Sequence, residues 1–180
     1  QLLQSSFPPY FQFLNSREIQ KRRIELETQL AKAYLKLGKW LYDLKGFNEE
    51  TISTIIKYYE KSKELNKQSY KAWQAWTYSN YEAIQFYKNY LTANKSPSIS
   101  QNANTNDQLI MQQHLIRQQQ EHVKPAIIGF FNCIKLRSTS TSAEEANCLQ
   151  DTLRLLTLWF DYGNKKDEYE CLSDGIKHTP

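Results

Sequence analysis

The sequence has 180 residues, a formal net charge of +4 and 13% aromatic residues, with only five Gly and five Pro. A chain of this length fits one domain that can bury a core, and its composition favours packed helices and excludes a disordered tail. Basic residues prevail in the first third and acidic residues in the last quarter. Solvated helix faces explain this gradient better than attraction of a polyanion to one end does.

Residues 1–16 contain Pro8 and Pro9 and are expected to form an extended arm, after which Asn15 or Ser16 can cap a first helix. Gly46 should end this helix, and Asn48 with the acids after it should cap the next. Apolar residues of the first helix recur every three, four or seven positions, giving a stripe of Ile19, Leu26, Leu30, Ala33, Leu37, Trp40, Leu41 and Leu44.

A second helix over about 50–65 and a third over about 69–91 resemble the junction of two tetratricopeptide units, so residues 17–91 are expected to form one group of such helices. The usual Pro of that turn is missing. The large residues expected to interlock neighbouring helices are Trp73, Trp76, Tyr81 and Ile84. Core packing explains these side chains better than ligand binding does.

Residues 92–106 are polar and aperiodic, which predicts a solvated insertion, and helices resume over 107–180. The first of these helices starts at about Asp107 and is more apolar from Val123 onward. Pro125 is expected in the first turn of its buried part or at a kink, and Gly129 permits close approach of another backbone.

A Ser/Thr loop at 138–142 precedes the densest apolar run of the chain, at 149–163. Leu149, Leu153, Leu156 and Phe160 are predicted to share one buried face, which Leu155, Leu158, Trp159 and Tyr162 widen. A helix that is apolar nearly all round should have neighbours on several sides, and its Asp151 and Arg154 should pair on the remaining polar edge. A last helix carries Tyr169, Leu172 and Ile176. The prediction is an all-α fold, an α-solenoid of six helices in antiparallel pairs.

No motif predicts catalysis, since a phosphate-binding glycine loop, a nucleophile elbow and the motifs of a protein kinase are all missing. His114, His122 and His178 lack ligand spacing, and Cys133, Cys148 and Cys171 form no CxxC pair. We therefore expect no metal site and read the cysteines as buried thiols in a reducing compartment. An apolar run long enough to span a membrane and a signal peptide are also missing.

One group of cations can bind a ligand: Arg23, with Lys21 and Arg22 beside it, on the first helix, Lys57 on the second, and Lys67 and Lys71 at the bend into the third. Antiparallel packing can bring Arg23 near Lys67, and several converging cations suit a polyphosphate. The alternative is lysines scattered over solvated faces. Nucleic acid fits less well, because no exposed aromatic residues alternate with these cations.

Three stretches together resemble the later part of the FAT domain of target-of-rapamycin (TOR) kinases. They are YLKLGKWLYDLKGFNEETI at 34–52, SYKAWQAWTYSNYEAI at 69–84, and PAIIGFF with CLQDTLRLLTLWFDYG within 125–163. The resemblance covers about residues 20–177. It implies a segment, itself noncatalytic, of a large protein serine/threonine kinase of nutrient and growth signalling, in which a helical solenoid wraps the kinase domain. The ATP and magnesium sites would follow Pro180, so we expect a piece of a longer protein.

The resemblance further implies a pocket for inositol hexakisphosphate. Lys71 matches one of its cations, Lys67 replaces another and Arg23 is a third, whereas Thr54 stands where a Lys is expected, with Lys57 one turn later. The implied partners are the kinase domain of the same chain and subunits of TOR complexes, in the cytoplasm and at endomembrane surfaces. The competing hypothesis is a free-standing tetratricopeptide adaptor. That adaptor would need at least three regular repeats, and only one unit, at about 50–84, has the pattern.

Overall fold

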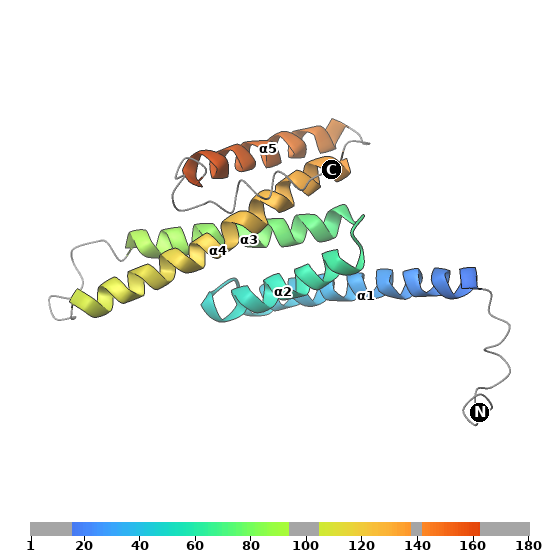
Figure 1. The fold of residues 1–180 in the computed structure, drawn as a ribbon, viewed down its shortest axis with the longest axis horizontal. Helices are drawn as coiled ribbons and strands as arrows, with labels where there is room; N and C mark the ends of the chain where they lie inside the picture. The colour runs from blue at the N-terminus through green and yellow to red at the C-terminus, as the bar shows by residue number, and fades with distance from the viewer. Residues whose placement is uncertain (1–15, 94–104, 138–141, 163–180) are drawn as a thin grey trace, which may run out of the picture.

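The computed structural model describes residues 16–93, 105–137 and 142–162, and all the regular structure in these ranges is helical (Figure 1). The helices are α1 (Ser16–Lys45), α2 (Glu49–Leu65), α3 (Tyr70–Ala93), α4 (Thr105–Arg137) and α5 (Ser142–Tyr162). The predicted all-α class is confirmed. The predicted arm, most of the insertion and the predicted last helix lie outside the described residues.

The α1–α2 boundary follows the predicted local chemistry. Gly46 has φ 74°, a left-handed conformation that suits glycine at the end of a helix. Asn48 caps α2, because its side chain accepts hydrogen bonds from the amides of Glu50 and Thr51, while the Thr51 hydroxyl accepts one from the Asn48 amide. These contacts pair amides that the first turn of a helix would otherwise leave unsatisfied.

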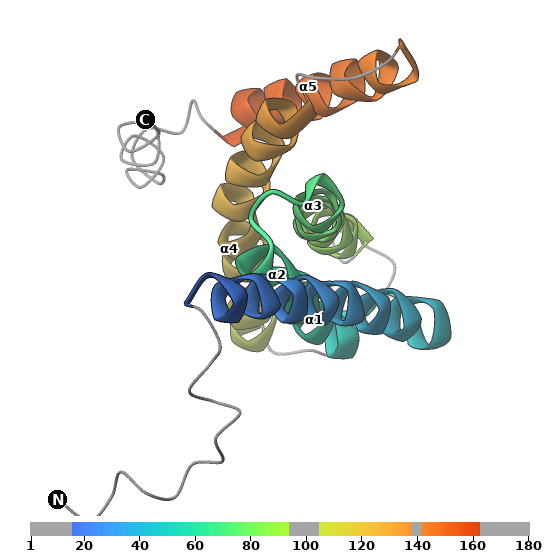
Figure 2. The same ribbon diagram turned by 90° about the vertical axis from the view of Figure 1, so that its right-hand side faces the viewer.

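Each helix packs against the next along the chain, with the most extensive contact between α3 and α4. Figures 1 and 2 show α1 and α2 as an antiparallel pair, α3 beside them, and α4 crossing α3 to reach α5. One core cluster joins α2 and α3 to the first half of α4 and includes Ile52, Ile55, Tyr59, Trp76, Tyr87 and Leu115. A second joins α3, the later part of α4 and α5, and includes Ile84, Val123, Ile127, Phe130, Leu155 and Leu158.

The α3–α4 contact depends on Gly129. A Cβ atom at this position would lie 2.0 Å from Oγ1 of Thr77 on α3, so the close neighbour is a side chain and not the backbone that was predicted. Helix α4 continues through Pro125. Its residue Leu115 belongs to the first core cluster, and Val123, eight residues later, belongs to the second. Helices α3 and α4 both contribute to the two clusters and therefore link them.

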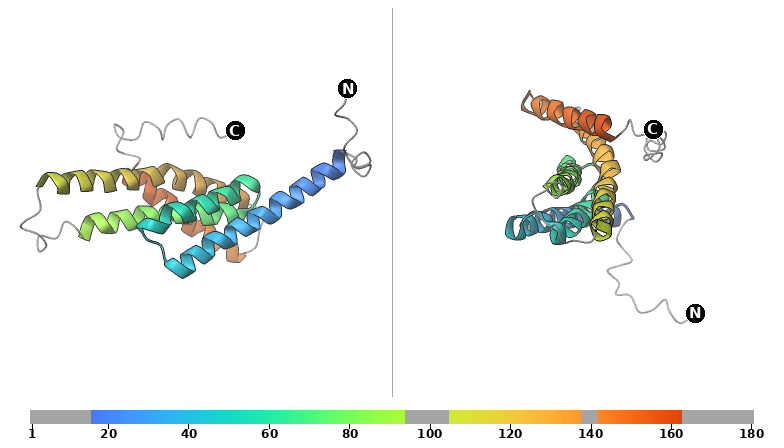
Figure 3. Two further views of the ribbon diagram at one scale, coloured as in Figure 1. Left: turned by 90° about the horizontal axis from the view of Figure 1, so that it is seen from below. Right: turned by 90° about the vertical axis from the view of Figure 1, so that its left-hand side faces the viewer.

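Much of the apolar stripe on α1 is exposed. The first turns of α1 project beyond the other helices (Figure 3), and Leu26 and Leu44 are 71% and 84% exposed. Ile19, Leu30, Leu37 and Trp40 are exposed as well. Ala31 is the buried apolar side chain on the described part of α1. Most of the predicted stripe is therefore exposed, although α1 and α2 pack against each other.

The predicted orientation of α5 was wrong. Leu153, Leu156 and Phe160 were expected to be buried and are exposed, Phe160 at 69%. The face against α3 and α4 instead carries Asp151, Leu155, Leu158 and Tyr162. Trp159 is 38% exposed, so among the described residues α5 is covered on one side and not on several.

Candidate functional site

The four cations predicted to bind a polyphosphate lie on three helices and one turn. Arg23 is on α1, Lys57 on α2, Lys67 in the turn between α2 and α3, and Lys71 in the first turn of α3. All four residues are exposed. The structure brings Lys67 and Lys71 to the same end of the helix pair. Lys57 lies eight residues before the end of α2, a distance of about 12 Å along the helix axis.

The register of α1 against α2 sets the position of Arg23. The Ser62 hydroxyl, near the end of α2, donates a hydrogen bond of 2.8 Å to the carbonyl of Ala31. Arg23 precedes Ala31 by eight residues, about 12 Å along the axis, and is on the projecting part of α1. Its Nε donates to Glu27 Oε1 at 2.8 Å, and this hydrogen bond and charge raise the pKa of Arg23. Arg23 is thus paired within its own helix.

Two side-chain hydrogen bonds tie the α2–α3 turn to α3. Ser69 directly precedes α3, and its hydroxyl oxygen accepts a hydrogen bond of 3.3 Å from the Ala72 amide. The indole Nε1 of Trp73 donates to the carbonyl oxygen of Lys67 at 2.8 Å. These bonds fix the backbone between the two exposed lysines.

Lys63, in the last turn of α2, is a further charged residue here that sequence patterns did not indicate. Its ammonium lies 4.1 Å from the ring centroid of Trp76 and 5.3 Å from that of Trp73. It also pairs with Glu60 at 3.7 Å. In the sequence, this lysine precedes two tryptophans on the other side of a turn. The three residues are not spaced along one helix face, so helical periodicity does not connect them.

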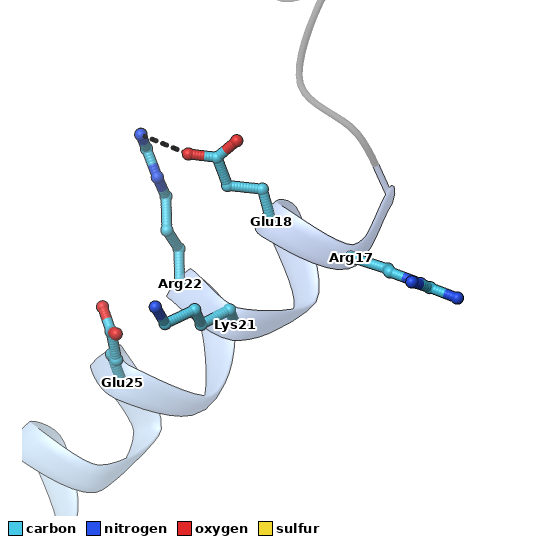
Figure 4. Close-up of a pocket in the computed structure, with 5 residues that line it drawn as sticks. All are labelled: Arg17, Glu18, Lys21, Arg22 and Glu25. Atoms are coloured by element: carbon cyan, nitrogen blue, oxygen red, sulfur yellow. Dashed lines mark hydrogen bonds and ion pairs between the residues drawn. The ribbon is translucent and has the colours of Figure 1, made fainter.

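A surface hollow of about 390 Å³ lies at the start of α1 and is lined by Arg17, Glu18, Lys21, Arg22 and Glu25. Figure 4 shows that these side chains come from successive turns of one helix and that Arg17 points away from the others. Arg22 pairs with Glu18 at 3.3 Å. Two carboxylates offset three cations here, and the hollow includes none of the four predicted ligands.

A second group of polar side chains lies between α3 and α5. The Tyr78 hydroxyl donates to Asp151 Oδ1 at 2.5 Å, and Asp151 is fully buried. Burial, followed by the hydrogen bond to Asp151, raises the pKa of Tyr78 to about 12. Arg154 lies 3.8 Å from Asp151 and stacks 4.6 Å from the Tyr78 ring centroid. The predicted Asp151–Arg154 pair is confirmed, but it is in the interface and not on a polar edge.

A third group of polar residues joins α3, α4 and α5. His122 Nδ1 lies 2.9 Å from Asn80 Oδ1, and its ring stacks on Tyr87 with centroids 6.0 Å apart. Gln119 Nε2 donates to the Tyr162 hydroxyl at 2.7 Å. Burial lowers the pKa of His122, which favours the neutral imidazole. These groups satisfy one another across helix interfaces and serve packing.

Within the described ranges, His, Cys, Asp and Glu side chains form no group of three that could hold a metal ion. None of the helices traced in the structure combines the length and apolar character needed to cross a bilayer. The described residues thus define a helical repeat segment with an exposed cationic turn.

Comparison with known proteins identifies the family. Residues 11–157 match the family model of the FAT domain, and the chain therefore belongs to the FAT domain family. It is 35% identical over 149 residues to the serine/threonine-protein kinase mTor of Drosophila melanogaster. It is also 30% identical over 152 residues to tor1 of Schizosaccharomyces pombe and 30% identical over 151 residues to TOR of Arabidopsis thaliana.

These three alignments include 82%, 84% and 83% of the present chain. They cover only 6%, 5% and 5% of the respective relatives. The chain thus spans about a twentieth of the length of the kinases it matches. The resemblance to TOR kinases that the sequence motifs indicated is confirmed.

Proposed function

We propose that this chain is a noncatalytic solenoid segment of a TOR-type protein serine/threonine kinase, in which it scaffolds and regulates the kinase domain. The observation that carries the proposal is the FAT family match over residues 11–157, together with similarity to several TOR kinases. Exposed apolar faces at the two ends of the helix stack, on α1 and α5, support it. A segment that continues into neighbouring helices would present such faces.

In this proposal ATP and magnesium belong to the kinase domain of the parent chain. The partners are that kinase domain and the subunits of TOR complexes. Activity in nutrient and growth signalling would place the parent in the cytoplasm and at endomembrane surfaces. The reading frame beyond Pro180 separates this proposal from a free-standing adaptor: kinase motifs would support the kinase, and a nearby stop codon would contradict it.

The regulatory role can be tested in the full-length parent kinase with Phe160→Asp, which places a charge on the exposed apolar face of α5. We expect reduced substrate phosphorylation or complex assembly. Thr157→Asp adds the same charge to the same helix at an exposed polar position and is the matched control. If Phe160→Asp and the control both retain parental activity and assembly, this face has no regulatory role.

We further propose that Lys67 and Lys71 bind inositol hexakisphosphate together with Arg23 and Lys57. The support is the exposure of all four cations and the meeting of two of them at one turn. Because charge would drive recognition, affinity should fall steeply with salt concentration. Lys71→Ala should weaken binding to the full-length parent more than Lys95→Ala, a control in the insertion. Equal effects of the two changes would mean that Lys67 and Lys71 are part of a solvated helix face and bind no ligand.

A further inference from the structure

The turn between α2 and α3 depends on one side chain that follows it. The Trp73 indole reaches back six residues to donate its N–H to the Lys67 carbonyl oxygen, 2.8 Å away. The neighbouring Trp76 is a natural comparison, since its indole N–H is buried and has no hydrogen-bond partner among the described residues. Of these two indoles, only Trp73 fixes the backbone that carries an exposed lysine.

The position of the Trp73 ring is itself constrained. Trp73 and Trp76 meet edge to face with centroids 5.8 Å apart and an interplanar angle of 82°. The Lys63 ammonium lies over both rings, at 4.1 Å from Trp76 and 5.3 Å from Trp73, and its side chain is only 14% exposed. A cation held over two aromatic rings, with its stem buried, restricts the rings that it contacts.

We propose that Trp73, braced by Lys63, is a positioning residue of the polyphosphate site. It fixes the backbone of Lys67 so that Lys67 and Lys71, four residues apart across the start of α3, present their charges from one preformed turn. This inference rests on the proposed inositol hexakisphosphate site. The indole itself does not contact the ligand in this scheme and acts through Lys67.

The physical reason is preorganisation. A turn without the Trp73 bond would spend only part of its time in the geometry that directs both lysines toward one anion, and apparent affinity falls in proportion to that fraction. One neutral hydrogen bond of ordinary strength corresponds to a change of about three- to tenfold in such an equilibrium. The expected loss is therefore modest and specific to Lys67.

The test compares Trp73→Phe with Trp76→Phe in the full-length parent chain. Each change removes one indole N–H and keeps an aromatic ring. We expect Trp73→Phe to speed amide hydrogen exchange across residues 66–69 and to weaken inositol hexakisphosphate binding about three- to tenfold. Trp76→Phe should change neither quantity beyond about twofold, because its N–H holds no turn carbonyl. Lys63→Met should give a smaller loss than Trp73→Phe.

A double-mutant cycle distinguishes positioning from general stabilisation. Lys67→Ala keeps the carbonyl acceptor and removes the charge that Trp73 is proposed to aim. If Trp73 acts through Lys67, Lys67→Ala should reduce affinity by a smaller factor in the Trp73→Phe background than in the parent. Multiplicative losses, or a Trp73→Phe protein with parental affinity, would overturn the inference.

The control Lys71→Ala tests the site itself. A parent that does not bind inositol hexakisphosphate, or that binds it equally well after Lys71→Ala, overturns both the site and the positioning role of Trp73. A parent whose binding depends on Lys71 but not on Trp73 retains the site and refutes only the positioning role.

Discussion

Asp151 is a carboxylate with 0% exposed surface between helices α3 and α5. Removing a charge from water is costly unless hydrogen bonds and an opposite charge replace its hydration. The Tyr78 hydroxyl and the guanidinium of Arg154 supply both. Arg154 in turn lies over the rings of Tyr78 and Tyr81, so this polar group fixes how α5 docks on α3.

Tyr78→Phe should destabilise the fold by about 1–3 kcal/mol, because it leaves a buried carboxylate oxygen without its hydroxyl donor. Asp151→Asn in the same background should recover part of the loss, since a neutral amide is less costly to bury than a charge. Urea unfolding of the four proteins of this cycle measures the coupling. Strictly additive losses would mean that the two residues stabilise the fold independently.

Trp159 and Leu158 are adjacent on α5 but differ in burial, at 38% and 1% exposed. Leu158→Ala should cost about 2–5 kcal/mol through lost burial and a residual cavity. Trp159→Ala should cost about 1 kcal/mol in this chain, because much of the indole remains in contact with water. A larger loss for Trp159→Ala than for Leu158→Ala in denaturant unfolding would show that the indole face is covered.

At the scale of whole elements, the sequence was most informative where a single residue controls the backbone. The end of α1 follows from Gly46 and the start of α2 from Asn48, since a left-handed residue and a side-chain cap act locally. The buried side of α5 could not be predicted in this way. When both sides of a helix are apolar, periodicity does not choose between them, and the packing partner decides.

Gly129→Ala should separate α3 from α4, because the added Cβ would lie 2.0 Å from Thr77 Oγ1 and 2.8 Å from Thr77 Cβ. Overpacking of this kind costs about 1–3 kcal/mol. Thr77→Ala should relieve only part of the loss, since the Cβ contact remains. The exposed neighbour Ile128→Ala is the control for helix α4. Unfolding of Gly129→Ala at the parental urea midpoint would show that the two helices adjust without cost.

For the whole molecule, the sequence predicts the parts of the candidate site that depend on local chain, and it does not predict the parts that depend on how the helices pack. Lys67 and Lys71 belong to one turn, so their proximity follows from four residues of local chain. The position of Arg23 depends on the register of α1 against α2, which the buried Ser62–Ala31 hydrogen bond fixes. Sequence spacing does not indicate the role of Lys63, because that role depends on contacts with two aromatic rings on the other side of the turn.

The isolated chain should unfold over a broad temperature range. Its two core clusters meet mainly through α3 and α4, and a stack held by nearest-neighbour contacts lets its ends open before its centre. The exposed apolar faces of α1 and α5 lack the burial that would couple them to further helices. Circular dichroism should therefore show a helical spectrum with a gradual melt, in which α5 loses hydrogen-exchange protection before α3. Extending the chain at both ends with the parent sequence should sharpen and raise the transition. A sharp, fully cooperative melt of the isolated chain, with α3 and α5 opening together, would contradict this picture of separable repeats.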